Sequence, residues 1–168
     1  NCRDRRGGAA AGVRGPGPER VVPLSPAPGL MQWRSREAQA VLPEGEQEVL
    51  KTIEQLEWHR TPEAAAKVQP ALQTAVATYL LSAKHSSGKP RDPVARFHLN
   101  NGARLERVNW LGDVSPKGLR EAAGFMVNYV YDLDEIENNH EDFAHNHAIA
   151  SSRHVRNLLR LKAQIANP

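Results

Sequence analysis

The sequence of 168 residues has one cysteine, few aromatic residues and no long uninterrupted apolar run. The lone Cys2 cannot form an internal disulfide, so we expect no disulfide framework. A transmembrane helix needs about 20 predominantly apolar residues, and no such segment occurs, so we expect no membrane partner. The chain also begins without the apolar core of a secretion signal and ends without a peroxisomal address. We therefore expect a cytoplasmic location.

A distributed excess of basic residues is also missing. The formal net charge is +3, and residues 1–20 account for all of it, because they contain five arginines and two acidic residues. The rest of the chain has equal numbers of acidic and basic side chains. Nucleic-acid binding depends on a clustered basic surface, so we expect no nucleic-acid partner.

Two regions of different composition are present. Residues 1–20 consist mainly of Arg, Gly, Ala and Pro and have almost nothing to bury, which is typical of disordered segments. We interpret residues 1–20 as a disordered or aberrant Arg/Gly/Ala-rich tract. Residues 21–168 are long enough for one ordinary domain with an apolar core.

Apolar periodicity and capping residues predict a mixed α/β (α+β) domain with several helices and few strands. The predicted helices cover residues 44–60, 62–84, 92–100, 115–124, 132–146 and 149–165, and the predicted strands cover 103–110 and 125–132. Pro70 is expected to kink or split the second helix, because proline removes a helical hydrogen bond.

The segment from Asp92 to Trp110 contains the most informative histidine. Asp92 is a good N-cap and Pro93 a good first helical residue, and Gly102 favours the end of the helix. His98 lies on the apolar face in the last helical turn, where the helix dipole favours the imidazolium form. His98 is thus either a proton donor or a hydrogen-bonded core residue, and spacing alone does not decide between them.

Ser25 lies in a stiff segment. The residue before a proline prefers an extended backbone, and Pro26 and Pro28 follow Ser25 closely. No base stands beside Ser25 in the sequence to mark it as a nucleophile.

The last part of the chain contains four histidines: His140, His145, His147 and His154. Their spacing is not a usual ligand spacing for zinc, and no cysteine accompanies them. We therefore predict no metal site.

Three segments together resemble the C-terminal part of malonyl-CoA decarboxylases. They are LSPAPG at 24–29, FHLNNGA at 97–103 and RVNWLGDVSPKGLREAAGFMVNYVYDL at 107–133. The similarity extends from about residue 22 to about residue 161, in the order of the family. It implies that residues 21–168 are the C-terminal part of a catalytic domain with an N-acetyltransferase-like fold.

The resemblance also implies the chemistry. Malonyl-CoA would be converted to acetyl-CoA and carbon dioxide in fatty acid metabolism, by a carbon-carbon lyase. No cofactor is expected, because the thioester of the substrate is itself the electron sink. A homo-oligomer is compatible with the resemblance for the full-length enzyme.

The active-site residues of the family fall on Ser25 and His98. The resemblance implies that His98 donates a proton to the carbanion or enolate and that Ser25 holds the malonyl carboxylate or carbonyl. Tyr131 corresponds to a tyrosine that approaches the site, although it and Tyr129 could simply line one face of a strand. Asn101 and Gly102 are expected to shape the substrate-binding corner after His98.

Two other functions remain open at this point. A CoA-dependent N-acyltransferase of the same fold would need a base for an amine, and a non-catalytic helical interaction module would need no site at all. The half of the family domain that binds the CoA pyrophosphate precedes the serine loop. We expect it to be outside this chain, and the isolated chain to be partly disordered and inactive.

Overall fold

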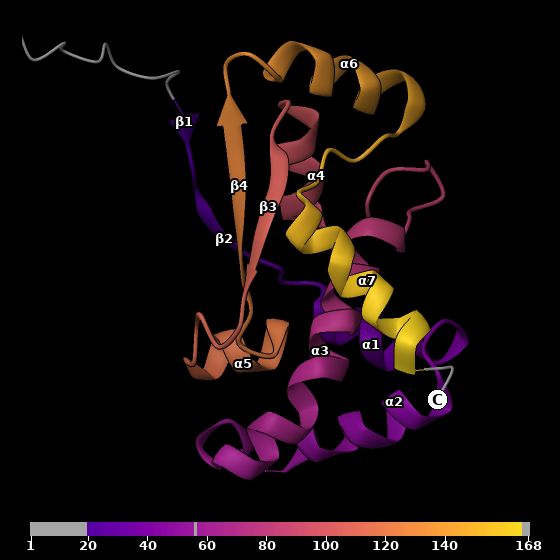
Figure 1. Ribbon diagram of the computed structural model, residues 1–168, viewed down its shortest axis with the longest axis vertical. Helices are drawn as coiled ribbons and strands as arrows, with labels where there is room; N and C mark the ends of the chain where they lie inside the picture. Colours follow the sequence, from indigo (N-terminus) through magenta and orange to yellow (C-terminus); the bar gives the residue numbers. More distant parts are fainter. Residues whose placement is uncertain (1–19, 56, 166–168) are drawn as a thin grey trace, which may run out of the picture.

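The computed structural model describes residues 20–55 and 57–165 and has a mixed α/β architecture (Figure 1). The strands are β1 (Arg20–Val21), β2 (Leu24–Pro26), β3 (Arg104–Asn109) and β4 (Met126–Asp132). The α-helices are α1 (Leu30–Arg36), α2 (Glu44–Leu50), α3 (Pro62–Ser82), α4 (Pro93–Asn100), α5 (Pro116–Ala122), α6 (Ile136–Asn146) and α7 (Arg153–Ile165). Short 3-10 helices are η1 (Ala38–Ala40), η2 (Lys51–Glu54) and η3 (Trp58–Arg60). The expected class is confirmed.

The sheet is antiparallel and centred on β4. β1 and β2 follow one another along one side of β4, and β3 pairs with its other side (Figure 1). In this register Ser25 lies opposite Val127, and Leu105 lies opposite Tyr129. The pairing of β2 was not predicted, because its short Leu-Ser-Pro sequence reads as a loop. Pro26 is compatible with the pairing of β2 with β4, because it is the last residue of a short strand at the sheet edge.

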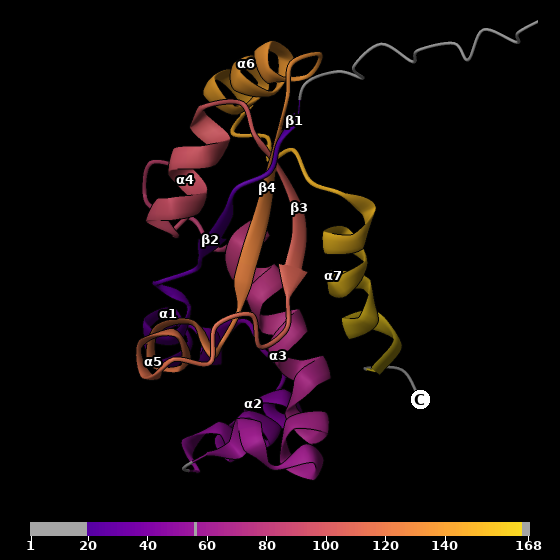
Figure 2. The same ribbon diagram turned by 90° about the vertical axis from the view of Figure 1, so that its left-hand side faces the viewer.

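Helix α3 occupies the centre of the helical layer. It packs against α2, α7 and β3, and Figure 2 shows α7 and α4 on different sides of the strands. The largest fully buried side chains include Leu72 and Leu80 of α3, Leu105 of β3, Tyr129 of β4, and Phe125 just before β4. This core holds β4 and α4 in fixed relative positions.

Two helix predictions differ from the structure. The helix expected over 44–60 ends at Leu50, and the chain continues as the 3-10 turns η2 and η3. Glu57, just before η3, adopts a left-handed backbone with φ of 59°. Pro70, which was expected to kink or split the second helix, does not split it, because α3 is continuous from Pro62 to Ser82. Burial of Val68 and Leu72 on either side of the proline explains how tertiary packing outweighs the local penalty.

The prediction for α4 is confirmed at both ends. Asp92 Oδ1 accepts hydrogen bonds from the backbone N–H groups of Val94 (3.0 Å) and Ala95 (2.9 Å). The helix ends at Asn100, and Gly102 adopts φ of 86°, where a Cβ would lie 2.4 Å from the Ile136 carbonyl oxygen. A glycine is therefore required at this corner.

No helix in residues 20–55 and 57–165 combines the length and the apolar character that crossing a bilayer would require. The disorder predicted for residues 1–20 concerns a tract that lies outside the described residues, apart from Arg20. Arg20 belongs to β1 and forms an ion pair with Asp132 (2.9 Å).

Candidate active site

Three side chains from separate elements form a continuous hydrogen-bonded line. Ser25 Oγ on β2 lies 3.0 Å from His98 Nε2, and His98 Nδ1 on α4 lies 2.6 Å from the hydroxyl of Tyr131 on β4. Both distances are within hydrogen-bond range. The structure thus brings together the three residues predicted as catalytic.

Alternation along β4 explains the position of the tyrosines. Residues two apart in a strand share a face, so Tyr129 and Tyr131 both approach His98. The ring of Tyr129 stacks on the imidazole, with centroids 4.3 Å apart and an interplanar angle of 24°. Tyr131 therefore lines one face of β4 together with Tyr129 and also contacts His98. The two alternatives considered for Tyr131 are thus compatible with each other.

Burial sets the protonation of the site. His98 is 8% exposed, and desolvation lowers its pKa from the ordinary value. The expectation that the helix C-terminus makes His98 an imidazolium is wrong, because loss of solvation outweighs the dipole. Burial also raises the pKa of Tyr131, so its hydroxyl remains protonated near neutral pH. The line thus consists of three uncharged groups.

Asp92 ties the segments of the site together. Besides capping α4, its Oδ2 accepts hydrogen bonds from the Tyr79 hydroxyl (2.9 Å) and, at 3.5 Å, from the backbone N–H of Gly29. Burial raises the pKa of Asp92, and the hydrogen bonds from Ala95, Tyr79 and Gly29 oppose that rise. The carboxyl group thereby joins the loop after Ser25, helix α3 and the helix that carries His98.

Sequence reasoning identified only the capping role of Asp92. Tyr79 looked like an ordinary apolar position of α3, and no local signal connects it with Asp92 or Gly29. Its hydroxyl lies so close to Gly29 that a Cβ there would be 2.2 Å away. The contact depends on how α1, α3 and α4 pack, which no short motif records.

Asn101 and Gly102 lie at the corner after α4, as predicted. Asn101 Nδ2 donates to the Phe97 carbonyl (2.9 Å), and the Gly102 carbonyl accepts from Asn139 Nδ2 (3.2 Å). These bonds connect the corner to α4 and α6. A substrate-binding role for either residue stays a prediction.

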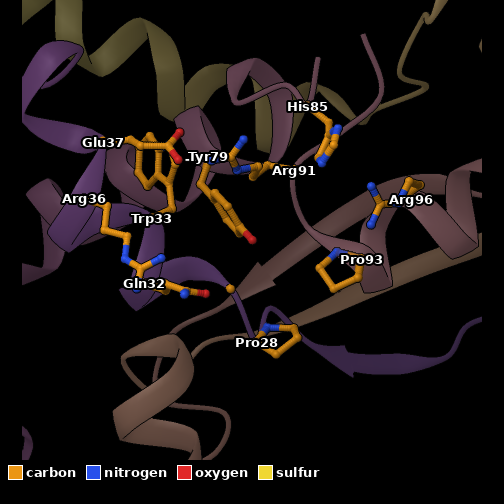
Figure 3. Close-up of a pocket in the computed structure, with 11 residues that line it drawn as sticks. Pro28, Gln32, Trp33, Arg36, Glu37, Tyr79, His85, Arg91, Pro93 and Arg96 are labelled. Atoms are coloured by element: carbon orange, nitrogen blue, oxygen red, sulfur yellow. Dashed lines mark hydrogen bonds and ion pairs between the residues drawn. The ribbon is translucent and has the colours of Figure 1, made fainter. Parts of the chain in front are cut away.

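A pocket of about 540 Å³ adjoins the segments that carry Ser25 and His98 (Figure 3). One part of its lining comes from the loop and helix after Ser25, the other from the start of α4 and the loop before it. The lining residues are Pro28, Gly29, Gln32, Trp33, Arg36, Glu37, Tyr79, His85, Arg91, Pro93 and Arg96. No motif in the sequence indicates this pocket.

The histidines near the end of the chain do not converge. His140 Nδ1 lies 2.6 Å from the Asn100 carbonyl oxygen, whereas His154 lines a different depression beside Val22. In the part of the chain that the structure describes, no group of three or more His, Cys, Asp or Glu side chains could hold a metal ion.

The sequence also matches a known family model. Residues 16–167 match the model of the malonyl-CoA decarboxylase C-terminal domain. The chain belongs to this family. The match begins inside the Arg/Gly/Ala-rich tract, at residue 16.

Curated relatives agree with this assignment. The mitochondrial malonyl-CoA decarboxylase of Anser anser anser is 32% identical over an alignment covering 79% of this chain and 30% of the relative. The mitochondrial enzyme of Rattus norvegicus is 39% identical over 61% of this chain and 21% of the relative. The chain therefore spans less than a third of the length of these two relatives.

Solved structures show the same relationship. The crystal structure of malonyl-CoA decarboxylase from Rhodopseudomonas palustris superposes with a TM-score of 0.78 at 41% identity, covering 83% of this chain and 33% of that one. The enzyme from Agrobacterium vitis gives a TM-score of 0.78 at 39% identity, covering 84% and 36%. The described fold is thus that of part of these enzymes.

Proposed function

We propose that this chain carries the Ser25–His98–Tyr131 site of a malonyl-CoA decarboxylase, a carboxy-lyase that converts malonyl-CoA to acetyl-CoA and carbon dioxide. The observation that carries the proposal is the hydrogen-bonded line of these three side chains in a member of this family. Because the chain spans about a third of its relatives, the activity of the whole enzyme is part of the proposal.

His98 acts as a neutral donor. In the tautomer that we propose, the Tyr131 hydroxyl donates to Nδ1, and the single imidazole proton is on Nε2, facing Ser25. A neutral imidazole can polarise a carbonyl group when its pKa is lowered, which is the direction that burial gives His98. The Tyr131 contact is compatible with the tautomer that the reaction needs.

The reaction uses this donor after the carbon–carbon bond breaks. The electron pair of that bond moves into the thioester and forms an enolate, carbon dioxide leaves, and the former methylene carbon takes up a proton. A preorganised donor to an enolate oxygen contributes about 3 kcal/mol of transition-state stabilisation. The Nε2–H of His98 stabilises the enolate and delivers its proton to the carbon, while Nδ1 takes up the proton of the Tyr131 hydroxyl, which water then restores. Ser25 holds the malonyl carboxylate or carbonyl.

The opposite tautomer supports a second candidate. If Nε2 accepts a proton from Ser25 at the 3.0 Å contact, His98 is a base, as a CoA-dependent N-acyltransferase would require. The two candidates differ in their products, because transfer needs an amine acceptor and decarboxylation does not.

Product analysis tests the proposal. Because the isolated chain is expected to be inactive, the test uses the full-length enzyme that contains this chain. We expect it to release carbon dioxide and acetyl-CoA from malonyl-CoA in equal amounts without any acceptor, and Ser25→Ala to slow this release by about 100-fold or more. Arg153→Gln, an exposed change at the start of α7, serves as the matched control. Malonyl transfer to an added amine without carbon dioxide release would support the acyltransferase instead. If neither carbon dioxide nor a malonylated amine forms, the result would support the non-catalytic helical interaction module.

Several further expectations belong to the proposal. They are the N-acetyltransferase-like fold, a role in fatty acid metabolism, the absence of a cofactor and the formation of a homo-oligomer. The cytoplasmic location also stays a prediction, and the names of the goose and rat relatives place those enzymes in mitochondria. Localisation of the tagged protein in cells would decide between the two compartments.

A further inference from the structure

Tyr129 lies against the face of the His98 imidazole and is not part of the hydrogen-bonded line. The two rings stack with centroids 4.3 Å apart and an interplanar angle of 24°. Phe97 and Tyr131 meet the same imidazole edge-on, at interplanar angles of 73° and 64°. Among the residues that the structure describes, Tyr129 is therefore the ring that supports a face of the imidazole.

The hydroxyl of Tyr129 takes no part in this contact. The side chain is fully buried, and its hydroxyl has no hydrogen-bond partner among the residues that the structure describes. Burial and the nearby charge of Asp92 raise the pKa of Tyr129, so the hydroxyl stays uncharged. A buried hydroxyl without a partner is unfavourable, so what Tyr129 contributes to the site comes from its ring.

Hydrogen bonds alone leave the imidazole poorly held during the proposed reaction. Nε2–H then serves the substrate and Ser25 binds the substrate too, so the 3.0 Å contact between His98 and Ser25 is given up. The imidazole keeps its 2.6 Å contact with Tyr131 at Nδ1. A ring held at one edge can still tilt unless a second surface supports it, and a displacement of about 1 Å can cost about 100-fold in rate.

The backbone of Tyr129 makes its ring a fixed surface. Strand β4 is paired on both sides, and Tyr129 lies opposite Leu105 of β3. On the other side its backbone N–H donates to the Pro23 carbonyl oxygen at 3.1 Å. A residue held from both edges of its strand provides a more rigid support than a loop residue would.

We propose that Tyr129 is a positioning residue for His98, whose ring supports the imidazole and keeps Nε2 directed at the substrate while Ser25 is engaged with that substrate. The inference rests on the proposed function and adds a residue that acts through His98. It requires the aromatic ring at position 129 and not the hydroxyl, whereas at Tyr131 the hydroxyl is the group that contacts His98.

Variants of the full-length enzyme that contains this chain separate the ring from the hydroxyl. Tyr129→Phe removes an unpartnered hydroxyl and keeps the stacked ring, so kcat for carbon dioxide release should stay within about twofold of the parent. Tyr129→Leu removes the ring, so kcat should fall by about tenfold or more while KM changes by less than about twofold. Tyr131→Phe, in contrast with Tyr129→Phe, should lower kcat because it removes the contact at Nδ1.

A matched control separates positioning from loss of core packing. Phe125 is as fully buried as Tyr129 but packs on Trp110, with centroids 5.5 Å apart. Phe125→Leu should therefore destabilise the fold as Tyr129→Leu does and leave kcat of the folded enzyme unchanged. In a His98→Asn background Tyr129→Leu should have almost no further effect on kcat, because the group that it positions is gone. Parental kcat in Tyr129→Leu, an equal loss in Phe125→Leu, or additive losses in the double variant would overturn the proposal.

The stack is also observable without turnover. In NMR spectra of the histidine-labelled enzyme, the ring current of residue 129 should shift the His98 ring protons upfield in the parent and in Tyr129→Phe, and Tyr129→Leu should move them downfield. His98→Asn identifies these signals by their loss. The expected shifts without carbon dioxide release by the parent would leave the support of His98 standing and remove the decarboxylase. Unmoved signals in Tyr129→Leu, with carbon dioxide release by the parent, would do the reverse.

Discussion

At the scale of single residues, the environment of His98 determines what the site can do. Both ring nitrogens have a neutral hydroxyl within hydrogen-bond distance, and Tyr129 covers one ring face. Desolvation lowers the pKa of the imidazole, so the neutral form predominates at pH 7. A neutral donor keeps its proton over a broad range of pH, whereas an imidazolium loses it above its pKa.

The pH profile of turnover separates these two forms of donor. With a neutral His98, kcat/KM for malonyl-CoA should stay nearly constant between about pH 7 and pH 9, because the raised pKa of Tyr131 keeps its hydroxyl protonated. An imidazolium donor would instead give a tenfold decrease for each unit above the lowered pKa. Such a decrease would contradict the neutral tautomer.

The stability of the fold should depend on His98 in a defined direction. A folded-state pKa below the usual value of about 6.5 means that the unfolded chain binds the proton first on acidification. The contribution of neutral His98 is therefore complete above about pH 6.5 and decreases as the pH falls toward the folded pKa. Urea unfolding at pH 7.5 and 5.5 should show a larger loss of stability for the parent than for His98→Gln.

An equal loss in both proteins would mean that His98 is not the group responsible. The other histidines are present in both proteins, so the comparison isolates the effect of His98.

The residue types of the site were predictable, and their environment was not. Ser25, His98 and Tyr131 were identified by resemblance, and their convergence is seen only in the fold. The direction of the His98 pKa shift was predicted wrongly, because the helix dipole can be read from sequence but the burial by Tyr129 and Tyr131 cannot.

At the scale of elements, α4 and the loop after Ser25 are aligned by the contacts of Asp92. The cap of α4 is local and follows from the Asp-Pro sequence, so both ends of this helix were predicted. The pairing of β2 and the bonds from Tyr79 and Gly29 are long-range, and sequence periodicity contains no information on them. The 3-10 turns after α2 were missed for the same reason.

Replacing Asp92 tests this alignment. Asp92→Ala removes the cap and leaves the buried Tyr79 hydroxyl without its acceptor, so we expect a loss of about 2–4 kcal/mol in the free energy of unfolding. Asp92→Asn keeps one oxygen for the cap and should lose less. Turnover at saturating substrate should follow the same order, since displacement of His98 is costly for catalysis. Unchanged turnover in a folded Asp92→Ala variant would show that this carboxyl does not position the site.

The close approach of Gly29 and Tyr79 gives a second test at this scale. Gly29→Ala should destabilise the fold by about 1–3 kcal/mol, because the added methyl would meet the Tyr79 hydroxyl at 2.2 Å. The same change in a Tyr79→Phe background should cost less, because the hydroxyl is gone. Gly45→Ala, which has open space around it in α2, should be neutral or stabilising. If the losses of stability caused by Gly29→Ala and Tyr79→Phe simply add in the double variant, Gly29 and Tyr79 are not in contact.

At the scale of the whole molecule, the Ser25–His98–Tyr131 site and the pocket of about 540 Å³ beside it are built on the same segments of the chain. The loop after Ser25 leads into α1, and α4 carries both Arg96 and His98. Helices α2, α3 and α7 form the body against which these parts rest, and α7 adjoins β3. A ligand that engages both ends of this arrangement should stabilise the whole domain.

Thermal unfolding with and without CoA measures that stabilisation. A ligand at 100 times its dissociation constant stabilises the folded state by about 2.7 kcal/mol, so the Tm should rise by several degrees. An unchanged Tm at the same concentration would mean that CoA does not bind to the folded protein.

The most direct test of the central claim is single-turnover carbon dioxide release by the full-length enzyme that contains this chain, as the parent, and by its His98→Asn variant, with CoA affinity measured in parallel. Asparagine can offer one hydrogen bond but cannot deliver the proton, so turnover should fall by about 100-fold or more while the dissociation constant of CoA changes by less than about twofold. Release of carbon dioxide at the parental rate by His98→Asn would contradict the assignment of the Ser25–His98–Tyr131 line as the decarboxylation site.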